Sequence, residues 1–160
     1  MSPEEDIQII SNTDVAKVTL HSVEDRPGIA ADFFSTLGTQ GFNIELVTSV
    51  PVSKGKANIS FVVAKEELPS VLAAIEPLKR DAKAERLSYD SRIALVSVCG
   101  HELIRQPGVA GRMFKSLSSA GINIEMISTS MSSITCIISE ESIYDAVKAL
   151  EREFEIKPFK

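Results

Sequence analysis

The residues best suited to bind a small ligand form a short turn that occurs twice. Pro27-Gly28-Ile29-Ala30 and Pro107-Gly108-Val109-Ala110 each stand where an apolar stripe of helical period begins. The first turn of a helix leaves backbone amides without acceptors, and a glycine without a Cβ lets an anion approach them closely. Each turn could therefore hold a carboxylate. A tight strand-to-helix connection without a ligand would use the same residues.

The polar neighbours of the two turns differ. Asp25 precedes the first turn and could accept the ammonium group of a ligand or simply cap the helix, whereas Arg105-Gln106 precedes the second. Asn43 and Asn123 open the apolar segments that follow the helices, where an amide could satisfy a turn or bind a ligand. Carboxylate and ammonium recognition together suit a free amino acid, and the two turns would not offer equivalent sites.

Both turns lie within an internal repeat. RPGIAADFFSTLGTQGFNIELVTSV, from Arg26 to Val50, returns as QPGVAGRMFKSLSSAGINIEMISTS, from Gln106 to Ser130. Repetition at this spacing indicates two copies of one structural module.

Hydrophobic periodicity predicts the elements that position the turns. In the first copy the expected strands are Val15–Val23, Phe42–Val50, Ala57–Ala64 and Ala84–Tyr89, and the expected helices run from Ile29 and from Leu68. We expect Phe42, Ile44 and Leu46 on one face of their strand, and a kink or an end of the second helix at Pro77. The order β-α-β-β-α-β favours an α+β fold of two ferredoxin-like modules, residues 1–91 and 92–160, each an antiparallel sheet with helices on one face.

The second copy has little chain left for a fourth strand. Its expected strands and helices follow the same order, at Ile93–Cys99, Val109–Leu117, Ile122–Thr129, Ile134–Ile138 and Ile143–Leu150. The remaining segment, Phe154–Phe159, contains Pro158, which cannot donate to a strand ladder. Ile7–Ile10 has strand character and no repeat partner. We therefore expect Ile7–Ile10 to cross over and complete the sheet of the second module.

Composition excludes several classes of protein. No apolar run approaches the roughly 18 residues of a membrane span, and the acidic N-terminus MSPEED lacks a secretory pattern, so we expect a cytoplasmic protein without a membrane partner. Cys99 and Cys136 are far apart in sequence and not beside a histidine, which argues against a disulfide framework and against a metal site.

Nucleic-acid binding and catalysis are also disfavoured. RNA-binding modules with this order of elements need aromatic residues on the central strands and a basic surface, but these strands read AKVTLHS and ANISFVV and the net charge is −5. No glycine-rich loop with a lysine is present to hold a nucleotide. We expect no nucleic-acid partner, no cofactor and no catalytic residues.

The repeated module resembles the ACT domain, a small regulatory unit that binds amino acids. The resemblance rests on the β-α-β-β-α-β order, on the DRPG-like turn into the first helix, and on G-[FI]-N-I-E at the next strand. Two modules in tandem, with INIEMISTS in the second, are similar to the regulatory region of aspartate kinase and to the separate β subunit of that enzyme. The resemblance covers about residues 7–155.

This resemblance implies an allosteric role without catalysis: the chain would sense threonine or lysine and pass that signal to a catalytic kinase subunit. It implies a site at a cleft between modules, formed by the helix turn of one and the second strand of another. Beyond Asp25 and the two Pro-Gly turns, the implied binding residues are Asn43, Ile44, Ser49, Gln106, Asn123, Ile124 and Thr129.

Two departures from the family pattern bear on specificity. Ser49-Val50 replaces a Gln-Asn pair, and Met131 replaces a glutamate that could meet a lysine ammonium group. Threonine is therefore the first candidate.

Open sheet edges are usually covered, so we expect a homodimer, with Val47 and Ile127 on the face that the helices leave open. The alternative is a purely architectural tandem, which dimerises and holds a partner without any small ligand.

Overall fold

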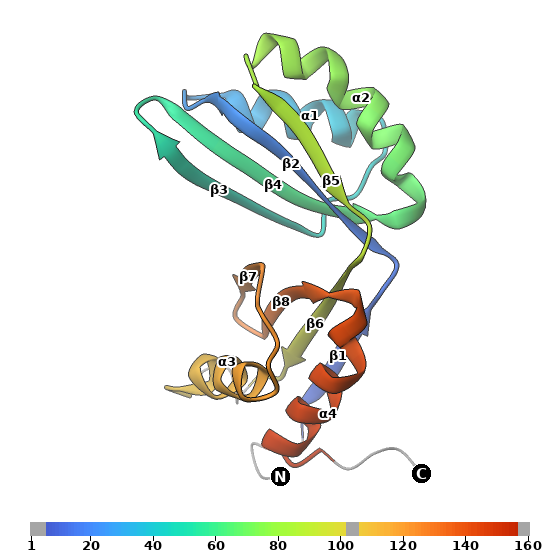
Figure 1. Cartoon of the computed structure of the whole chain (residues 1–160), viewed down its shortest axis with the longest axis vertical. Helices are drawn as coiled ribbons and strands as arrows, with labels where there is room; N and C mark the ends of the chain where they lie inside the picture. The colour runs from blue at the N-terminus through green and yellow to red at the C-terminus, as the bar shows by residue number, and fades with distance from the viewer. Residues whose placement is uncertain (1–5, 102–105, 157–160) are drawn as a thin grey trace. The chain divides into compact units, whose positions relative to one another are not determined.

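The computed structural model describes residues 6–101 and 106–156. These residues form two units: one is Asp14–Ser91, and the other combines the described residues up to Thr13 with those from Arg92 onward. Each unit contains a four-stranded antiparallel sheet and two α-helices (Figure 1). The architecture is α+β and ferredoxin-like in both units. Arg105 and the segment from residue 157, including Pro158, lie outside the described residues.

The Asp14–Ser91 unit has the strand order β3-β4-β2-β5. Its elements in chain order are β2 (Val15–Glu24), α1 (Ile29–Thr39), β3 (Leu46–Ser53), β4 (Lys56–Ala64), the 3₁₀ turn η1 (Lys65–Glu67), α2 (Leu68–Asp81) and β5 (Arg86–Asp90). The helices bury one stripe each against the sheet: Phe33 and Leu37 from α1, and Val71 and Ile75 from α2, are almost completely inaccessible. Full burial of such a side chain contributes about 1.5–3 kcal/mol.

Phe61 lies at the centre of this core. Its exposed fraction is 0%, and its ring meets that of Phe34 edge to face at a centroid distance of 5.5 Å. The pair joins α1 to the central strand β4, which fixes the position of the helix and of the turn that begins it.

The other unit has the strand order β1-β6-β8-β7. Its elements are β1 (Gln8–Asn12), β6 (Ile93–Cys99), α3 (Val109–Ser119), β7 (Met126–Thr129), β8 (Ser133–Ser139), the 3₁₀ turn η2 (Glu140–Ser142) and α4 (Ile143–Glu153). β1 runs antiparallel to β6, with Gln8 opposite Cys99 and Asn12 opposite Leu95. It occupies the position that β5 holds in the first unit, and Ile7 before it is buried in the core of this second unit.

The strand registers correct two expectations about faces. Val47 pairs with Phe61, and Ile127 pairs with Cys136. Phe61 and Cys136 belong to the cores beneath the helices, and directly opposed residues share a face. Val47 and Ile127 therefore lie at the sheet edges on the helix side, not on the open face.

The second strand of each module also begins later than expected. Phe42 and Ile44 precede β3 in a loop, although both still pack against the core. Leu46 pairs with Val62, on the face opposite to Phe61. The expectation that Phe42, Ile44 and Leu46 share one strand face is therefore wrong. The amide of Phe42 is used to close α1, donating to the Leu37 carbonyl at 3.0 Å, so the strand ladder starts only afterwards.

Pro77 does not end α2, which continues to Asp81. Pro77 lacks a backbone N–H, so α2 loses one hydrogen bond on its exposed face. The buried side chains of Val71 and Ile75 still anchor the helix, and the Ala82 amide donates to the Leu78 carbonyl at 3.0 Å at its end. Within the described ranges, no helix is both long enough and apolar enough to span a membrane.

The open faces of the sheets carry polar pairs across strands. Thr19 and Ser60 hydroxyls lie 2.9 Å apart, those of Ser97 and Thr135 2.6 Å apart, and His21 Nε2 lies 2.7 Å from Ser88 Oγ. Burial is the largest cause of a lowered pKa at His21, followed by the nearby Arg86 charge. His21 is thus hydrogen-bonded within the sheet, and its surroundings disfavour the charged form.

Candidate functional site

The first Pro-Gly turn presents an uncapped helix N-terminus. Gly28 adopts a left-handed conformation, with φ 93°, and no side chain caps α1. The Ile29 amide donates to the Arg26 carbonyl at 3.3 Å, whereas the amides of Gly28, Ala30 and Ala31 have no acceptor among the described residues. Pro27, Gly28 and Ala30 are exposed and Ile29 is buried. The turn is anchored by Ile29 and directs free donors towards solvent, as an anion site requires.

Asp25 does not cap the helix. Its backbone amide donates to the Gly55 carbonyl at 3.0 Å, which ties the start of the turn to the β3–β4 hairpin. The side chain is exposed and has no partner among the residues that the structure describes. Its carboxylate is thus unpaired in the described structure, three residues before Gly28 in the sequence.

Arg26 is the residue of this turn that sequence reasoning missed. Its Nε lies 3.3 Å from Glu24 Oε2 and one terminal nitrogen lies 3.4 Å from Asp32 Oδ2. The other terminal nitrogen, Nη1, lies 4.0 Å from where a Cβ on Gly28 would stand. The signal was available, because Arg26 directly precedes Pro27 and its repeat counterpart is the neutral Gln106.

Glu24 links this turn to the end of α2. Lys83 Nζ donates to Glu24 Oε1 at 2.8 Å, and this hydrogen bond is the largest cause of a lowered pKa at Glu24, ahead of the Lys83 charge. Glu24, Arg26, Asp32 and Lys83 form a surface ion cluster, which holds the guanidinium next to the turn.

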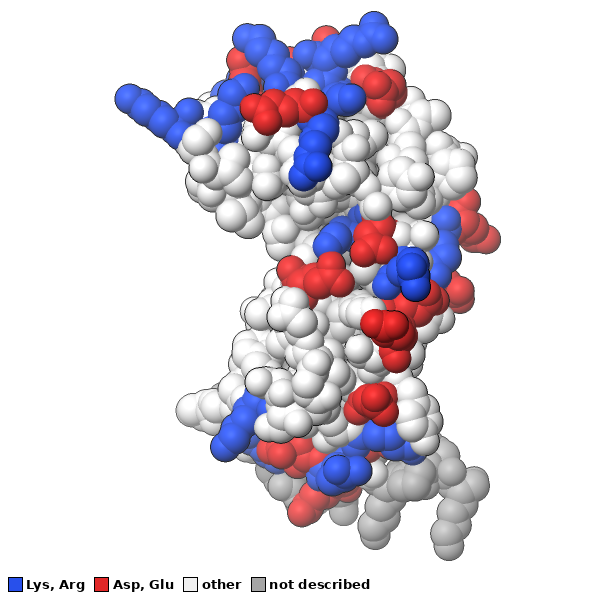
Figure 2. Space-filling view, in the orientation of Figure 1, with Lys and Arg blue, Asp and Glu red and all other residues white. Residues whose placement is uncertain are grey.

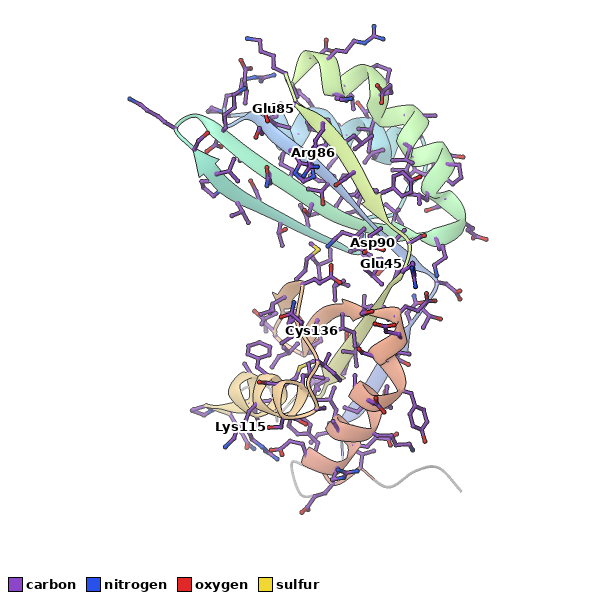
Figure 3. All side chains as sticks on the ribbon, viewed as in Figure 1. Glu45, Glu85, Arg86, Asp90, Lys115 and Cys136 are labelled. Carbon is purple, nitrogen blue, oxygen red and sulfur yellow. The ribbon has the colours of Figure 1, made fainter. Side chains whose placement is uncertain are left out.

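The loop residues on the other side of α1 do not join this turn within the unit. Asn43 and Ile44 follow the C-terminus of α1, an 11-residue helix that spans about 16 Å. Asn43 is exposed and its Nδ2 donates to Glu45 Oε1 at 3.3 Å, so its amide already serves a local turn. Glu45 stands at the entry to β3 (Figure 3). Ser49 is exposed on β3 and pairs with Ile59.

The second turn has the same backbone but different side chains. Gly108 has φ 92° and no side chain caps α3. The amides of Gly108, Val109 and Ala110 have no acceptor in the described part of the chain, while the Arg112 amide donates to the Gly108 carbonyl at 3.0 Å. Gln106 is exposed and supplies no charge.

The remaining candidates of this unit are dispersed. Asn123 is exposed and Ile124 partly buried in the loop before β7, and exposed Thr129 ends β7 opposite Ile134. Within either unit, these strand and loop residues do not join the Pro-Gly turn. A bound amino acid that contacted both kinds of residue would need them from different units.

No cluster of three or more metal-binding side chains occurs among residues 6–101 and 106–156. Cys136 lies on β8 (Figure 3) and burial raises the pKa of its thiol to about 12. Burial also raises the pKa of Cys99. Neither thiol is activated for nucleophilic chemistry.

Comparison with known proteins decides the family. The ACT domain profile matches residues 18–80, and a second ACT domain profile matches residues 96–154. The regulatory subunit of aspartate kinase from Thermus thermophilus is 31% identical, with a TM-score of 0.86, and the match covers 91% of this chain and 96% of that one. The chain belongs to the ACT domain family, as a tandem ACT regulatory region.

Two further relatives of this tandem ACT region show its extent. The regulatory subunit of aspartate kinase from Thermus flavus is 30% identical with a TM-score of 0.85, over 93% of this chain and 99% of that chain. The aspartokinase of Helicobacter pylori strain 26695 is 33% identical over 141 residues, which are 88% of this chain but 34% of that protein. The ACT tandem therefore spans about a third of the length of the curated aspartokinases that it matches.

Proposed function

We propose that this ACT tandem binds a free amino acid and passes that event to a catalytic aspartate kinase. The observation that supports the proposal most directly is the uncapped first turn, where free amides, the Arg26 guanidinium and the unpaired Asp25 carboxylate lie within a few residues of each other. The amides and Arg26 would receive the α-carboxylate, and Asp25 would receive the α-ammonium group.

The two turns predict unequal sites. The second turn offers amides with the neutral Gln106, and no carboxylate precedes it in sequence as Asp25 precedes the first. We infer that the first turn is the tighter amino-acid site. The residues expected opposite the bound ligand are Asn123, Ile124 and Thr129, with Asn43, Ile44 and Ser49 in the same role at the second turn.

Threonine is the proposed ligand, with lysine second. Met131, at 77% exposure, stands where the family pattern has a glutamate, so a lysine side chain would lack its ion-pair partner there. A small side chain with a hydroxyl group does not require that carboxylate.

Regulation follows if the ligand prefers one arrangement of the protein. A ligand shifts a conformational equilibrium only by its difference in affinity between the states. We propose a homodimer associated with a catalytic subunit as the assembly that responds, as the aspartate kinase relatives suggest.

A thermal-shift screen of the twenty amino acids tests this function. At a ligand concentration about a hundred times Kd, binding stabilises by about 2.7 kcal/mol, which raises Tm by roughly 5–10 °C for a chain of this size. Asp25→Asn should reduce the shift strongly, while Asp145→Asn, an exposed carboxylate on α4, should leave it unchanged.

Two results would redirect the proposal. A flat screen at millimolar concentrations would favour the architectural tandem. A shift that is unaltered in both Asp25→Asn and Asn123→Ala would show that a ligand binds elsewhere.

A further inference from the structure

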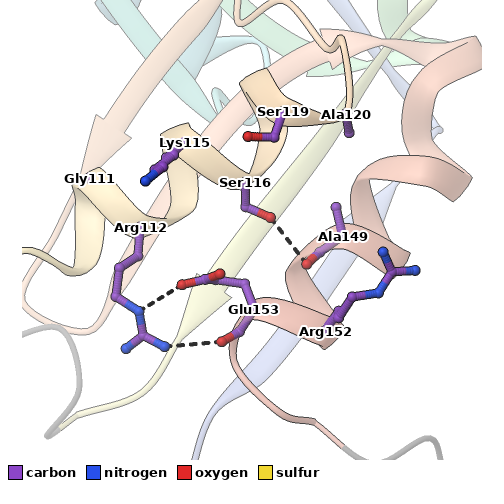
Figure 4. Close-up of a pocket in the computed structure, with 9 residues that line it drawn as sticks. All are labelled: Gly111, Arg112, Lys115, Ser116, Ser119, Ala120, Ala149, Arg152 and Glu153. Atoms are coloured by element: carbon purple, nitrogen blue, oxygen red, sulfur yellow. Dashed lines mark hydrogen bonds and ion pairs between the residues drawn. The ribbon is translucent and has the colours of Figure 1, made fainter.

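A polar groove runs between α3 and α4, and its lining begins at Gly111, directly after the second Pro-Gly turn. Its volume is about 610 Å³ (Figure 4). Neither helix places a bulky apolar side chain in the groove. The lining is mostly small residues, namely Gly111, Ser116, Ser119, Ala120 and Ala149. Ser116 Oγ donates to the Ala149 carbonyl at 3.1 Å, which holds the two helices together at the floor.

Arg112 and Glu153 close one end of the groove. Arg112 Nε lies 3.0 Å from Glu153 Oε1, and a terminal nitrogen donates to the Glu153 carbonyl at 3.0 Å. The guanidinium also stands over the Phe154 ring, 4.7 Å from its centroid. These contacts neutralise Glu153, the one carboxylate in the groove lining.

Two cations remain on the rims. Lys115 on α3 and Arg152 on α4 are exposed, and neither has a carboxylate partner among the described residues. Lys115 projects from the outer side of α3 (Figure 3). Figure 2 shows acidic and basic side chains interspersed on one face of the molecule. The positive charge is therefore a property of the groove lining, where Arg112, Lys115 and Arg152 stand against Glu153 alone.

The first unit provides an internal comparison. The corresponding hollow between α1 and α2 has a volume of about 380 Å³ and is lined by Asp32 and Asp81 as well as Arg26. In repeat positions, Asp32 corresponds to Arg112, Ser35 to Lys115, and Pro77 to Arg152. The positive groove is therefore not a property that the repeated fold imposes, but a feature of the second copy alone.

We propose that the α3–α4 groove binds an acidic segment of a protein partner. Lys115 and Arg152 pair with carboxylates from opposite rims, and the small floor residues give room for the segment between them. Because the two cations lie on different helices, a segment laid along the groove can meet one on each side. A nucleic acid is disfavoured because two unpaired cations on a chain of net charge −5 give little attraction for a polyphosphate.

Fluorescence anisotropy with a fluorescein-labelled octaglutamate peptide tests this docking. The full chain should bind the peptide with saturation below 1 mM, and added salt should weaken binding. The double variant Lys115→Gln/Arg152→Gln should weaken it about tenfold, since each exposed ion pair contributes a few-fold. Circular dichroism and Tm should be unchanged, because both side chains are exposed.

The matched control is Lys54→Gln/Arg80→Gln, which removes one exposed lysine and one exposed arginine from the other unit. It should change affinity less than twofold. An equal loss in this control, equal binding of octaglutamine, full competition by 10 mM inorganic phosphate, or no saturation below 1 mM would each overturn the proposal.

Discussion

At the scale of single residues, the repeated turn depends on a backbone conformation that only glycine adopts readily. Gly28 and Gly108 have nearly the same positive φ, 93° and 92°. Space is not the constraint at Gly28, because the nearest neighbour of an added Cβ would be an arginine nitrogen at 4.0 Å. The requirement at this position is therefore conformational.

Gly28→Ala should destabilise the protein by about 1–2 kcal/mol, which is the cost of a left-handed conformation for an alanine. Gly38→Ala is the matched control, since Gly38 is exposed inside α1, is not at positive φ and has open space around it. That change should stabilise by roughly 0.5–1 kcal/mol. Urea denaturation measures both, and equal effects of the same sign would contradict the assignment.

His21 should make stability depend on pH just below neutrality. Its folded-state pKa is lowered from 6.5, mainly by burial and then by Arg86, against a smaller opposing effect of Glu85. Above pH 6.5 the contribution of His21 to the free energy of unfolding is fully present. It is lost as the pH falls through the folded-state pKa, because the unfolded state then binds more protons than the folded state.

The change in urea midpoint between about pH 7.5 and pH 5.5 measures this effect. His21→Gln can keep the hydrogen bond to Ser88 but cannot bind a proton. Its urea midpoint should therefore fall less than that of the wild type between these two pH values. An identical pH dependence in the two proteins would assign the effect to other groups.

At the scale of elements, Arg112 joins the two helices of the second unit. It contacts the side chain and the backbone of Glu153 and the ring of Phe154, so one residue on α3 holds the C-terminal end of α4. Its surroundings are about half exposed, with side-chain exposures of 41% for Arg112 and 38% for Glu153. Solvent screening therefore limits each contact.

Arg112→Met should cost about 1 kcal/mol of unfolding free energy through the lost ion pair and ring contact. Lys148→Met is the comparison, since Lys148 also has a carboxylate, Glu151, and a ring, Tyr144, but contacts only its own helix. We expect about 0.3 kcal/mol there. Equal losses measured by chemical denaturation would mean that the link between helices adds nothing.

The sequence predicts the elements well where periodicity is strong and less well at their starts. Ile93–Cys99 and the beginnings of α1 and α3 are as expected, because alternation and the Pro-Gly turns mark them clearly. The start of β3 at Leu46 was missed because Phe42 and Ile44 continue the apolar pattern without joining the ladder.

For the candidate site, the sequence predicts the backbone conformation of the turn but not the positions of its charged side chains. The Pro-Gly pair identifies a helix N-terminus, but the position of Arg26 depends on Glu24 and Asp32, contacts that spacing alone does not specify. The predicted sheet faces of Val47 and Ile127 were wrong for a similar reason. Spacing alone does not specify the register, and a shift of one residue moves every side chain of a strand to the other face of the sheet.

At the scale of the whole molecule, the two units differ in their connectivity. Asp14–Ser91 is continuous in sequence, whereas the other unit needs β1 from before residue 14 and β6 to α4 from after residue 91. β1 covers the edge of β6, and Ile7 belongs to the buried core of this second unit.

A fragment of residues 14–91 should fold by itself with a cooperative urea transition, and a fragment of residues 92–160 should not. A chain in which residues 6–13 are moved behind residue 160 through a Gly-Ser linker should recover the fold of the second unit, because β1 can then pair with β6 from the other end. Amide hydrogen exchange in β6 reports the result. Strong protection of β6 in the 92–160 fragment would show that β1 is dispensable.

This connectivity has a consequence during synthesis on the ribosome. β1 leaves the exit tunnel roughly eighty residues before β6 is made, so at about 5–20 residues per second it waits roughly 4–16 s without its partner strand. During that interval Ile7, Ile9 and Ile10 form a short β-prone segment with nothing to cover it. Nascent chains on one message are close together, so we expect the β6 of a neighbouring chain to compete for this strand during translation and to give some domain-swapped dimers.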